Sequence, residues 1–133
     1  MIPLFADTSF YIAIVSVRDI AHAKAIAAAR AHHGSTVTTE YVLLEVANWL
    51  SRADDKPVFL DLHAQLKADP ASDIVPVDSA IRDRGLALYE TRRDKDWSLT
   101  DCVSFIVMRE RGLDQALTSD HHFEQAGFTI LLK

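Results

Sequence analysis

Short apolar runs alternate along the chain with longer stretches of helix-forming residues. These runs and the β-branched segment 35–38 have the length of β-strands, and we expect five strands, at residues 2–6, 35–38, 73–77, 115–118 and 128–132. Pro76 lies inside the third run and has no backbone N–H to donate, which favours an edge position for that strand.

The segments between the apolar runs are rich in helix formers, and we expect helices at residues 10–14, 20–33, 40–52, 57–68, 79–92, 99–111 and 121–125. Asp19 and Asp78 are suited to begin helices, and Gly34 and Gly112 are suited to end them. Strands that alternate with helices imply right-handed crossovers and a parallel sheet covered on both faces. The predicted fold is therefore α/β, with a central parallel sheet of about five strands.

Composition narrows the class of protein. The chain has 133 residues, 49% of them hydrophobic and 25% charged, which is typical of one soluble domain spanning residues 1–133. Because no apolar run approaches the roughly 20 residues that span a bilayer, we expect no membrane segment and a cytoplasmic protein. The single cysteine, Cys102, excludes an internal disulfide and is expected in the core.

Four acidic residues lie in or directly beside apolar segments: Asp7, Glu45, Asp101 and Asp120. An ionised group next to a core costs roughly several kcal/mol unless it is hydrogen-bonded, paired or bound to a metal. Asp7 and Asp120 each follow a predicted strand, and ligands of such sheets gather beyond the carboxyl ends of the strands. Their recurring context suggests one site.

Each acid also has a structural interpretation when it is considered alone. Asp7 and Asp120 could cap the helices that follow them, and Ser98 with Asp101 matches the pattern of a capping box. Glu45 is harder to explain in this way, because its neighbours on the predicted helix leave little solvated face.

Together, the four acids favour a cation site. Two carboxylates about 4 Å apart repel by roughly 4 kcal/mol at an effective dielectric constant of 20, so converging acids need a counter-charge. Oxygen ligands suit Mg²⁺ or Mn²⁺, and such ions can activate water against a phosphodiester. The formal net charge of −5 argues against general binding of nucleic acid, although bound cations would invert the local field. The predicted chemistry is hydrolysis of nucleic acid.

The ordered motifs resemble a PIN domain, and most of all the small VapC-type toxins of bacterial toxin–antitoxin pairs. The motifs are the residues 4–9, the helical Glu45, the residues 98–102 and the residues 117–120 with Phe123 and Gly127 downstream. The resemblance implies a three-layer α/β/α sandwich and a Mg²⁺- or Mn²⁺-dependent endoribonuclease that acts on RNA. It also implies a homodimer and a protein antitoxin that inserts into the active site.

By the same resemblance, the acidic quartet that holds the metal and carries catalysis is matched by Asp7, Glu45, Asp101 and Asp120. The neighbouring small polar positions, which can hydrogen-bond the acids or metal-bound water, are matched by Thr8, Ser9 and Ser119.

Other residues have simpler interpretations. His121 and His122 are adjacent on a predicted helix, which makes a shared ion difficult, so we expect solvated side chains. Trp49 and Trp97 are expected in buried packing or a dimer contact, and Asp96 in a solvated loop or behind the metal ligands. Two other functions remain open: a phosphatase-like hydrolase with Asp7 as nucleophile, and a non-catalytic interaction module whose acids are helix caps.

Overall fold

A five-stranded parallel sheet forms the centre of the protein in a computed structural model that describes residues 2–133. Met1 lies outside the described residues. The strands are β1 (Leu4–Ala6), β2 (Thr36–Thr39), β3 (Ser72–Val75), β4 (Gln115–Leu117) and β5 (Thr129–Ile130). Their order in the sheet is β3-β2-β1-β4-β5, and each neighbouring pair is parallel. The predicted parallel sheet is confirmed, and the strand before Pro76 lies at an edge as expected.

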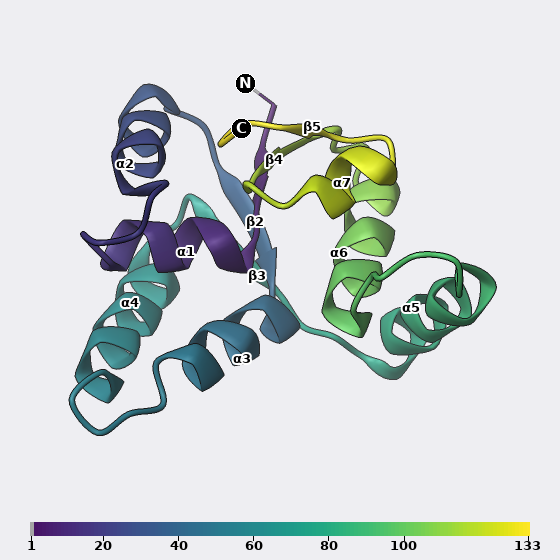
Figure 1. Ribbon diagram of the computed structural model, residues 1–133, viewed down its shortest axis with the longest axis horizontal. Coiled ribbons are helices and arrows are strands. Elements are labelled where there is room, and N and C mark those ends of the chain that lie inside the picture. Colours follow the sequence, from purple (N-terminus) through teal and green to yellow (C-terminus); the bar gives the residue numbers. More distant parts are fainter. Residues whose placement is uncertain (1) are drawn as a thin grey trace.

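Helices cover both faces of this sheet (Figure 1). They are α1 (Thr8–Val15), α2 (His22–Ala31), α3 (Glu40–Trp49), α4 (Lys56–Ala68), α5 (Ser79–Thr91), α6 (Leu99–Glu110) and α7 (His121–Gln125). In Figure 1, α1, α2 and α4 lie on one side of the sheet, and α6 and α7 lie on the other, with α5 outside α6. The result is the three-layer α/β/α sandwich that the sequence predicts.

The core is built from the strands and from the buried faces of α1, α3 and α6. Phe5 of β1 has no exposed surface, and its ring lies 6.2 Å from that of Phe123 on α7. Phe105 of α6 packs edge-on against Phe123 with ring centres 4.9 Å apart. Cys102 is buried in the same core, as expected, and burial raises the pKa of its thiol to about 11. These contacts fix α6 and α7 relative to β1.

Helix ends follow the sequence signals at some positions and depart from them at others. Gly112 and Gly127 adopt positive φ angles of 66° and 98°, and each follows a helix, so the expected stop at Gly112 is confirmed. Gly34 is not a stop of this kind, because α2 already ends at Ala31 and the His32 ring makes a 2.8 Å hydrogen bond with the Ser35 carbonyl.

The start of α2 and the length of β5 also differ from expectation. The Asp19 carboxylate accepts a 2.8 Å hydrogen bond from the Ala21 N–H, which makes a local turn, so the helix begins only at His22. The fifth strand is limited to Thr129–Ile130, because β4 alone borders it. Trp97 is 4% exposed, so its expected burial is confirmed, whereas Trp49 is 58% exposed and the alternative expected for it, a dimer contact, stays a prediction.

The strand order places a crevice at one end of the sheet. From β1 the chain moves outward to β2 and β3, and it then returns to the other side of β1 with β4 and β5. The crevice beyond the carboxyl ends of β1 and β4 is therefore the point at which the strand order reverses, where such sheets usually bind ligands. Within residues 2–133, no helix is long and apolar enough to cross a membrane.

Candidate metal centre

Asp7 stands at the carboxyl end of β1 and is 4% exposed. Its backbone N–H donates to the Leu117 carbonyl at 3.1 Å, which fixes the end of β1 against the end of β4. Asp7 occupies the N-cap position of α1, but among the described residues its side chain makes no capping hydrogen bond to that helix. Helix capping by its carboxylate therefore does not explain why this acid is buried.

A chain of hydroxyl groups leads to the Asp7 carboxylate. The Thr118 hydroxyl donates to Asp7 Oδ2 at 2.9 Å, and the Asp120 N–H donates to Thr118 Oγ1 at 3.0 Å. Because the single Thr118 proton is directed to Asp7, the Ser9 hydroxyl, 2.9 Å away, is the donor in its contact with Thr118. This chain orients its protons toward a carboxylate, which fits an ionised Asp7.

Burial works in the opposite direction to the hydroxyl chain. Loss of hydration, with a smaller contribution from the nearby charges of Asp101 and Asp120, raises the pKa of Asp7 from its ordinary value of 3.8 to about 7. The hydrogen bonds from the Thr8 backbone N–H and the Thr118 hydroxyl lower the pKa of Asp7, but they do not offset the effect of burial. A positive charge in the crevice would favour the ionised form and remove this penalty.

Glu45 reaches the crevice from α3. Its Oε1 accepts a 2.7 Å hydrogen bond from the Thr8 hydroxyl, which belongs to the first turn of α1. The contact links the helices that follow β1 and β2. Thr8 thus positions Glu45, which agrees with the small polar role expected for it from the sequence.

Asp101 begins the buried face of α6 and is itself 8% exposed. It forms the expected capping box: Ser98 Oγ accepts from the Asp101 N–H at 3.0 Å, and Asp101 Oδ2 accepts from the Ser98 N–H at 3.1 Å. The same Oδ2 lies 3.1 Å from His122 Nδ1. Burial raises the pKa of Asp101, and the charge of Asp120 adds to this effect.

Asp120 follows β4 and caps α7, because its Oδ1 accepts from the His122 N–H at 2.9 Å. His122 Nδ1 lies 3.3 Å from the same oxygen, so one ring nitrogen is close to carboxylates of both Asp101 and Asp120. The capping interpretations of Asp101 and Asp120 are therefore correct, but they do not exclude a second role for either acid.

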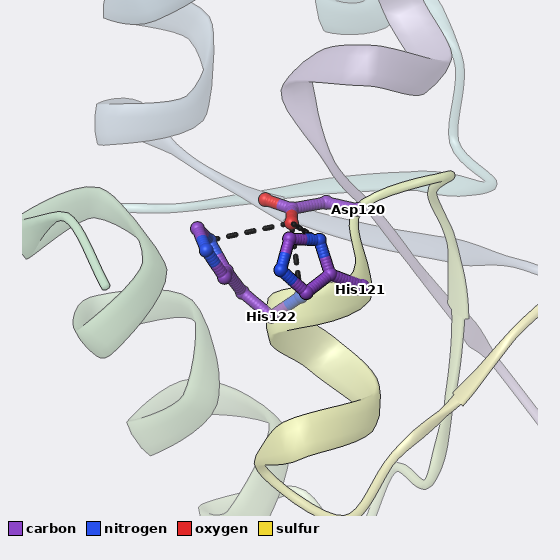
Figure 2. A group of neighbouring side chains, drawn as sticks. All are labelled: Asp120, His121 and His122. Carbon is purple, nitrogen blue, oxygen red and sulfur yellow. Dashed lines mark hydrogen bonds and ion pairs between the residues drawn. The ribbon is translucent and has the colours of Figure 1, made fainter. Parts of the chain in front are cut away.

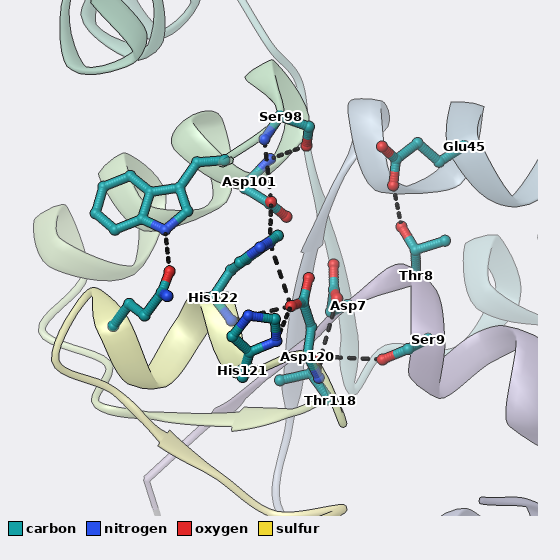
Figure 3. A network of polar contacts seen from close by, with 12 residues as sticks. Asp7, Thr8, Ser9, Glu45, Ser98, Asp101, Thr118, Asp120, His121 and His122 are labelled. Atoms are coloured by element: carbon teal, nitrogen blue, oxygen red, sulfur yellow. Dashed lines mark hydrogen bonds and ion pairs between the residues drawn. The ribbon is translucent and has the colours of Figure 1, made fainter. Parts of the chain in front are cut away.

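The four acids line one cleft of about 300 Å³, together with Thr8, Ser9, Ile12, Asp96, Ser98 and His122. Figure 3 shows Asp7 and Asp120 in the middle, with Glu45 on one side and Asp101 on the other. Asp96 is exposed at the border of this cleft, as expected for a solvated loop residue. The structure brings the four predicted acids together, whereas their role as metal ligands stays a prediction.

The acids are spread more widely than the shell of a single ion. Within residues 2–133, one group of three potential ligands has its donor atoms all within 4.8 Å of one another, and it consists of Asp120, His121 and His122. Mg²⁺ usually keeps several waters and binds directly to one or two carboxylates, so a wide ring of carboxylates with water inside fits this ion.

Three polar residues near the cleft differ from expectation. His122 is only 19% exposed at its side chain and contacts two of the acids, so its expected solvated position is wrong. Thr118, which contacts Asp7 most directly, was not singled out by any sequence signal. Ser119 contributes its backbone N–H, 3.2 Å from Ser9 Oγ, whereas its side chain is exposed.

A family model described as "PIN domain" matches residues 4–129, which is nearly the whole chain. The chain belongs to the PIN domain family. Among curated proteins, this PIN domain is 25% identical over 125 residues to the 23S rRNA-specific endonuclease VapC20 of Mycobacterium tuberculosis. The alignment covers 94% of this chain and 95% of that protein.

Solved structures show the same fold. The structure of VapC20 from Mycobacterium tuberculosis, described as a Sarcin-Ricin loop cleaving toxin, matches with a TM-score of 0.87 and 24% identity over 95% of this chain and 96% of that one. FitAcB from Neisseria gonorrhoeae matches this PIN domain with a TM-score of 0.67 and 16% identity over 96% of each chain. A toxin–antitoxin complex from Klebsiella pneumoniae matches with a TM-score of 0.63 and 17% identity over 89% of this chain and 87% of the matched chain.

Proposed function

We propose that this PIN domain is a metal-dependent endoribonuclease that hydrolyses RNA phosphodiesters. The observation that carries the proposal is the convergence of four acids from β1, α3, α6 and the β4–α7 connection on one cleft. Similarity over almost the full length to a 23S rRNA-specific endonuclease supports RNA as the substrate class.

The residues of the cleft fit Mg²⁺ or Mn²⁺. All four acids offer oxygen ligands, and burial and mutual repulsion raise the pKa values of Asp7 and Asp101, an energetic cost that a divalent cation would offset. Asp7, Glu45, Asp101 and Asp120 would hold the ion directly or through water. A bound divalent cation would supply Lewis-acid chemistry, which activates water and stabilises the charge that develops on the phosphate.

The chain's own residues keep these acids ready for that role. Thr118 and Thr8 donate hydrogen bonds to Asp7 and Glu45, which fix the orientation of the two carboxylates. The capping box does the same for Asp101 on the rigid α6. Acids held in this way lose little freedom when the cation and RNA bind, which lowers the cost of reaching a reactive geometry.

We further propose that the protein is the toxin of a toxin–antitoxin pair, acts in the cytoplasm and forms a homodimer. The similarity to VapC20 and to a solved toxin–antitoxin complex supports a protein antitoxin. An apolar groove of about 460 Å³ between α3, α4 and β3 offers a surface for such a partner, with Leu44 57% exposed in its lining.

The experiment is incubation of purified protein with an RNA substrate in the presence of Mn²⁺ or of EDTA. We expect cleavage with Mn²⁺ and none with EDTA. Cleavage that continues unchanged in EDTA would contradict metal dependence, and intact RNA under all metal conditions would contradict the nuclease proposal.

The two alternatives fit the geometry less well. A phosphatase that uses Asp7 as nucleophile needs an accessible carboxylate, yet this side chain is almost fully buried, and the position two residues on is Ser9, which is engaged with Thr118. An interaction module with acidic helix caps explains Asp101 and Asp120 but not Asp7 or Glu45. Phosphate release from a small phosphomonoester without RNA cleavage would favour the first alternative, and absence of divalent-cation binding would favour the second.

A further inference from the structure

The start of α7 brings two imidazole rings to one carboxylate (Figure 2). His121 Nδ1 lies 3.8 Å from Asp120 Oδ1, and His122 Nδ1 lies 3.3 Å from the same oxygen. The two ring centres are 4.5 Å apart. His121 is 71% exposed at its side chain, yet its ring lies beside Asp120 and His122 rather than extending away from them.

These distances are close to those of a metal site. Zn–N and Zn–O bonds of about 2.0–2.1 Å in a tetrahedral site place neighbouring donor atoms roughly 3.4 Å apart. The two measured nitrogen–oxygen distances, 3.3 and 3.8 Å, lie near this value. The donor atoms of all three side chains lie within 4.8 Å of one another, so the three residues together could hold one Zn²⁺ ion.

The donor set also selects the ion. Two imidazole nitrogens and one carboxylate oxygen suit Zn²⁺, whereas Mg²⁺ prefers oxygen ligands alone. Sites of mixed nitrogen and oxygen ligands also bind Zn²⁺ more tightly than Mn²⁺. We propose that Asp120, His121 and His122 form a Zn²⁺ site that shares Asp120 with the acidic cleft and inhibits the enzyme when it is filled.

Inhibition follows from the shared side chains. An Asp120 carboxylate that binds Zn²⁺ would be less available to the Mg²⁺ or Mn²⁺ proposed for the cleft. His122 Nδ1 would turn from Asp101 to the zinc and release a contact of 3.1 Å that now orients Asp101. This inhibitory role rests on the proposed nuclease function, but the zinc site itself does not.

The zinc site is tested by calorimetric titration of the purified, metal-free protein with ZnCl₂ in the absence of RNA. We expect His121→Asn to weaken zinc binding by at least roughly tenfold. Loss of a residue that only hydrogen-bonds a metal ligand already lowers metal affinity by about 10–100-fold, and His121 is proposed to bind the zinc directly. The matched control is His33→Asn, since His33 is an exposed histidine beyond the end of α2, and it should bind zinc as the wild type does. Wild-type and His121→Asn proteins with equal zinc affinity would overturn the site.

Inhibition is tested separately by RNA cleavage in Mg²⁺ with increasing ZnCl₂. We expect zinc to slow the wild type and His33→Asn, whereas His121→Asn should cleave at the wild-type rate without zinc and resist inhibition. Zinc binding that depends on His121 but leaves cleavage unchanged would overturn the inhibitory role. A protein that cleaves no RNA at all would contradict the proposed function, while the zinc titration would still decide the site.

Discussion

Asp7 is the residue at which burial and the proposed metal-binding role conflict most directly. Its pKa in the folded, metal-free protein is about 7, above the ordinary 3.8, so the native state holds the Asp7 proton more tightly than the unfolded state does. The stability associated with this proton is fully present below about pH 4 and is lost as the pH rises through about 7. The difference between these two pKa values corresponds to a change of about 4 kcal/mol at most in the free energy of unfolding.

Asp7→Asn should therefore stabilise the metal-free protein at pH 8 and have little effect on stability at pH 4. The amide can still accept the Thr118 hydrogen bond, so the change removes mainly the charge. Denaturant unfolding in EDTA at the two pH values measures the effect, with Asp114→Asn as the control because Asp114 is an exposed acid before β4. A variant no more stable than the wild type at pH 8 would show that ionised Asp7 carries no burial cost.

Thr118 links Asp7, Ser9 and the Asp120 N–H through one buried hydroxyl. Thr118→Val keeps the shape of the side chain but leaves these groups without their partner, which costs about 1–3 kcal/mol for a buried polar group. Unfolding free energies give the measurement. Thr91→Val is the matched control, since Thr91 is exposed on α5 and should change stability by about 0.5 kcal/mol or less. Equal effects of the two substitutions would contradict the role assigned to Thr118.

Single residues show where sequence reasoning succeeds and where it stops. Asp7 and Asp101 stand out in the sequence because carboxylates are costly beside apolar runs. His122 and Thr118 do not stand out, because a histidine near a helix start and a threonine after a strand are both ordinary. Their contacts with acids distant in the chain arise only when β4 and α7 are placed against β1 and α6.

At the scale of elements, the packing of α5 on α6 supports the position of Asp101. A Cβ atom on Gly85 would lie 2.7 Å from Val103 Cγ2, and Val103 is fully buried on α6. Val103 cannot easily turn aside, because a β-branched side chain in a helix has one strongly preferred rotamer. The close approach of the two helices therefore depends on this glycine.

Gly85→Val should destabilise the protein by about 1–3 kcal/mol more than Ala87→Val, which places the same side chain on an exposed part of α5. Because α6 carries Asp101, we also expect Gly85→Val to weaken Mn²⁺ binding by the folded protein. Thermal or denaturant unfolding and a Mn²⁺ titration provide the two measurements. Equal stability of both valine variants would show that α5 can move away without cost.

Element boundaries were predictable where the sequence contains a local signal. Gly112 and Asp78 act at the ends expected for α6 and α5. The end of α2 was not predictable, because it depends on a contact between His32 and Ser35 rather than on Gly34. The fifth strand is shorter than its apolar run because pairing with β4, not hydropathy, sets its length.

At the scale of the whole molecule, the net charge of −5 limits how the protein could bind its proposed RNA substrate. Arg93 and Lys95 line a depression of about 480 Å³ that shares Asp96 and Ser98 with the acidic cleft. If these two cations contact phosphates of single-stranded RNA, the logarithm of affinity should fall with the logarithm of salt concentration with a slope of about −1.4.

RNA binding by the non-cleaving Asp101→Asn variant, measured over a series of KCl concentrations, tests this prediction. Adding Lys95→Gln should make the slope shallower by about 0.7. Adding Arg82→Gln instead is the control, because Arg82 is an exposed residue near the start of α5 that does not line the depression. A slope that is steep and insensitive to Lys95 would place the RNA on another surface.

The proposal that the four acids hold a cation used for RNA cleavage is tested most directly by single-turnover cleavage of one RNA at a fixed Mn²⁺ concentration. The wild type is compared with two variants that each lose one carboxylate. Asp101→Asn removes a carboxylate that lines the cleft, and Asp114→Asn removes one outside it. We expect Asp101→Asn to lose about 100-fold or more in rate, on the scale of removing one group that stabilises the transition state, while Asp114→Asn keeps the wild-type rate. An Asp101→Asn protein that cleaves as fast as the wild type would contradict the proposed metal centre.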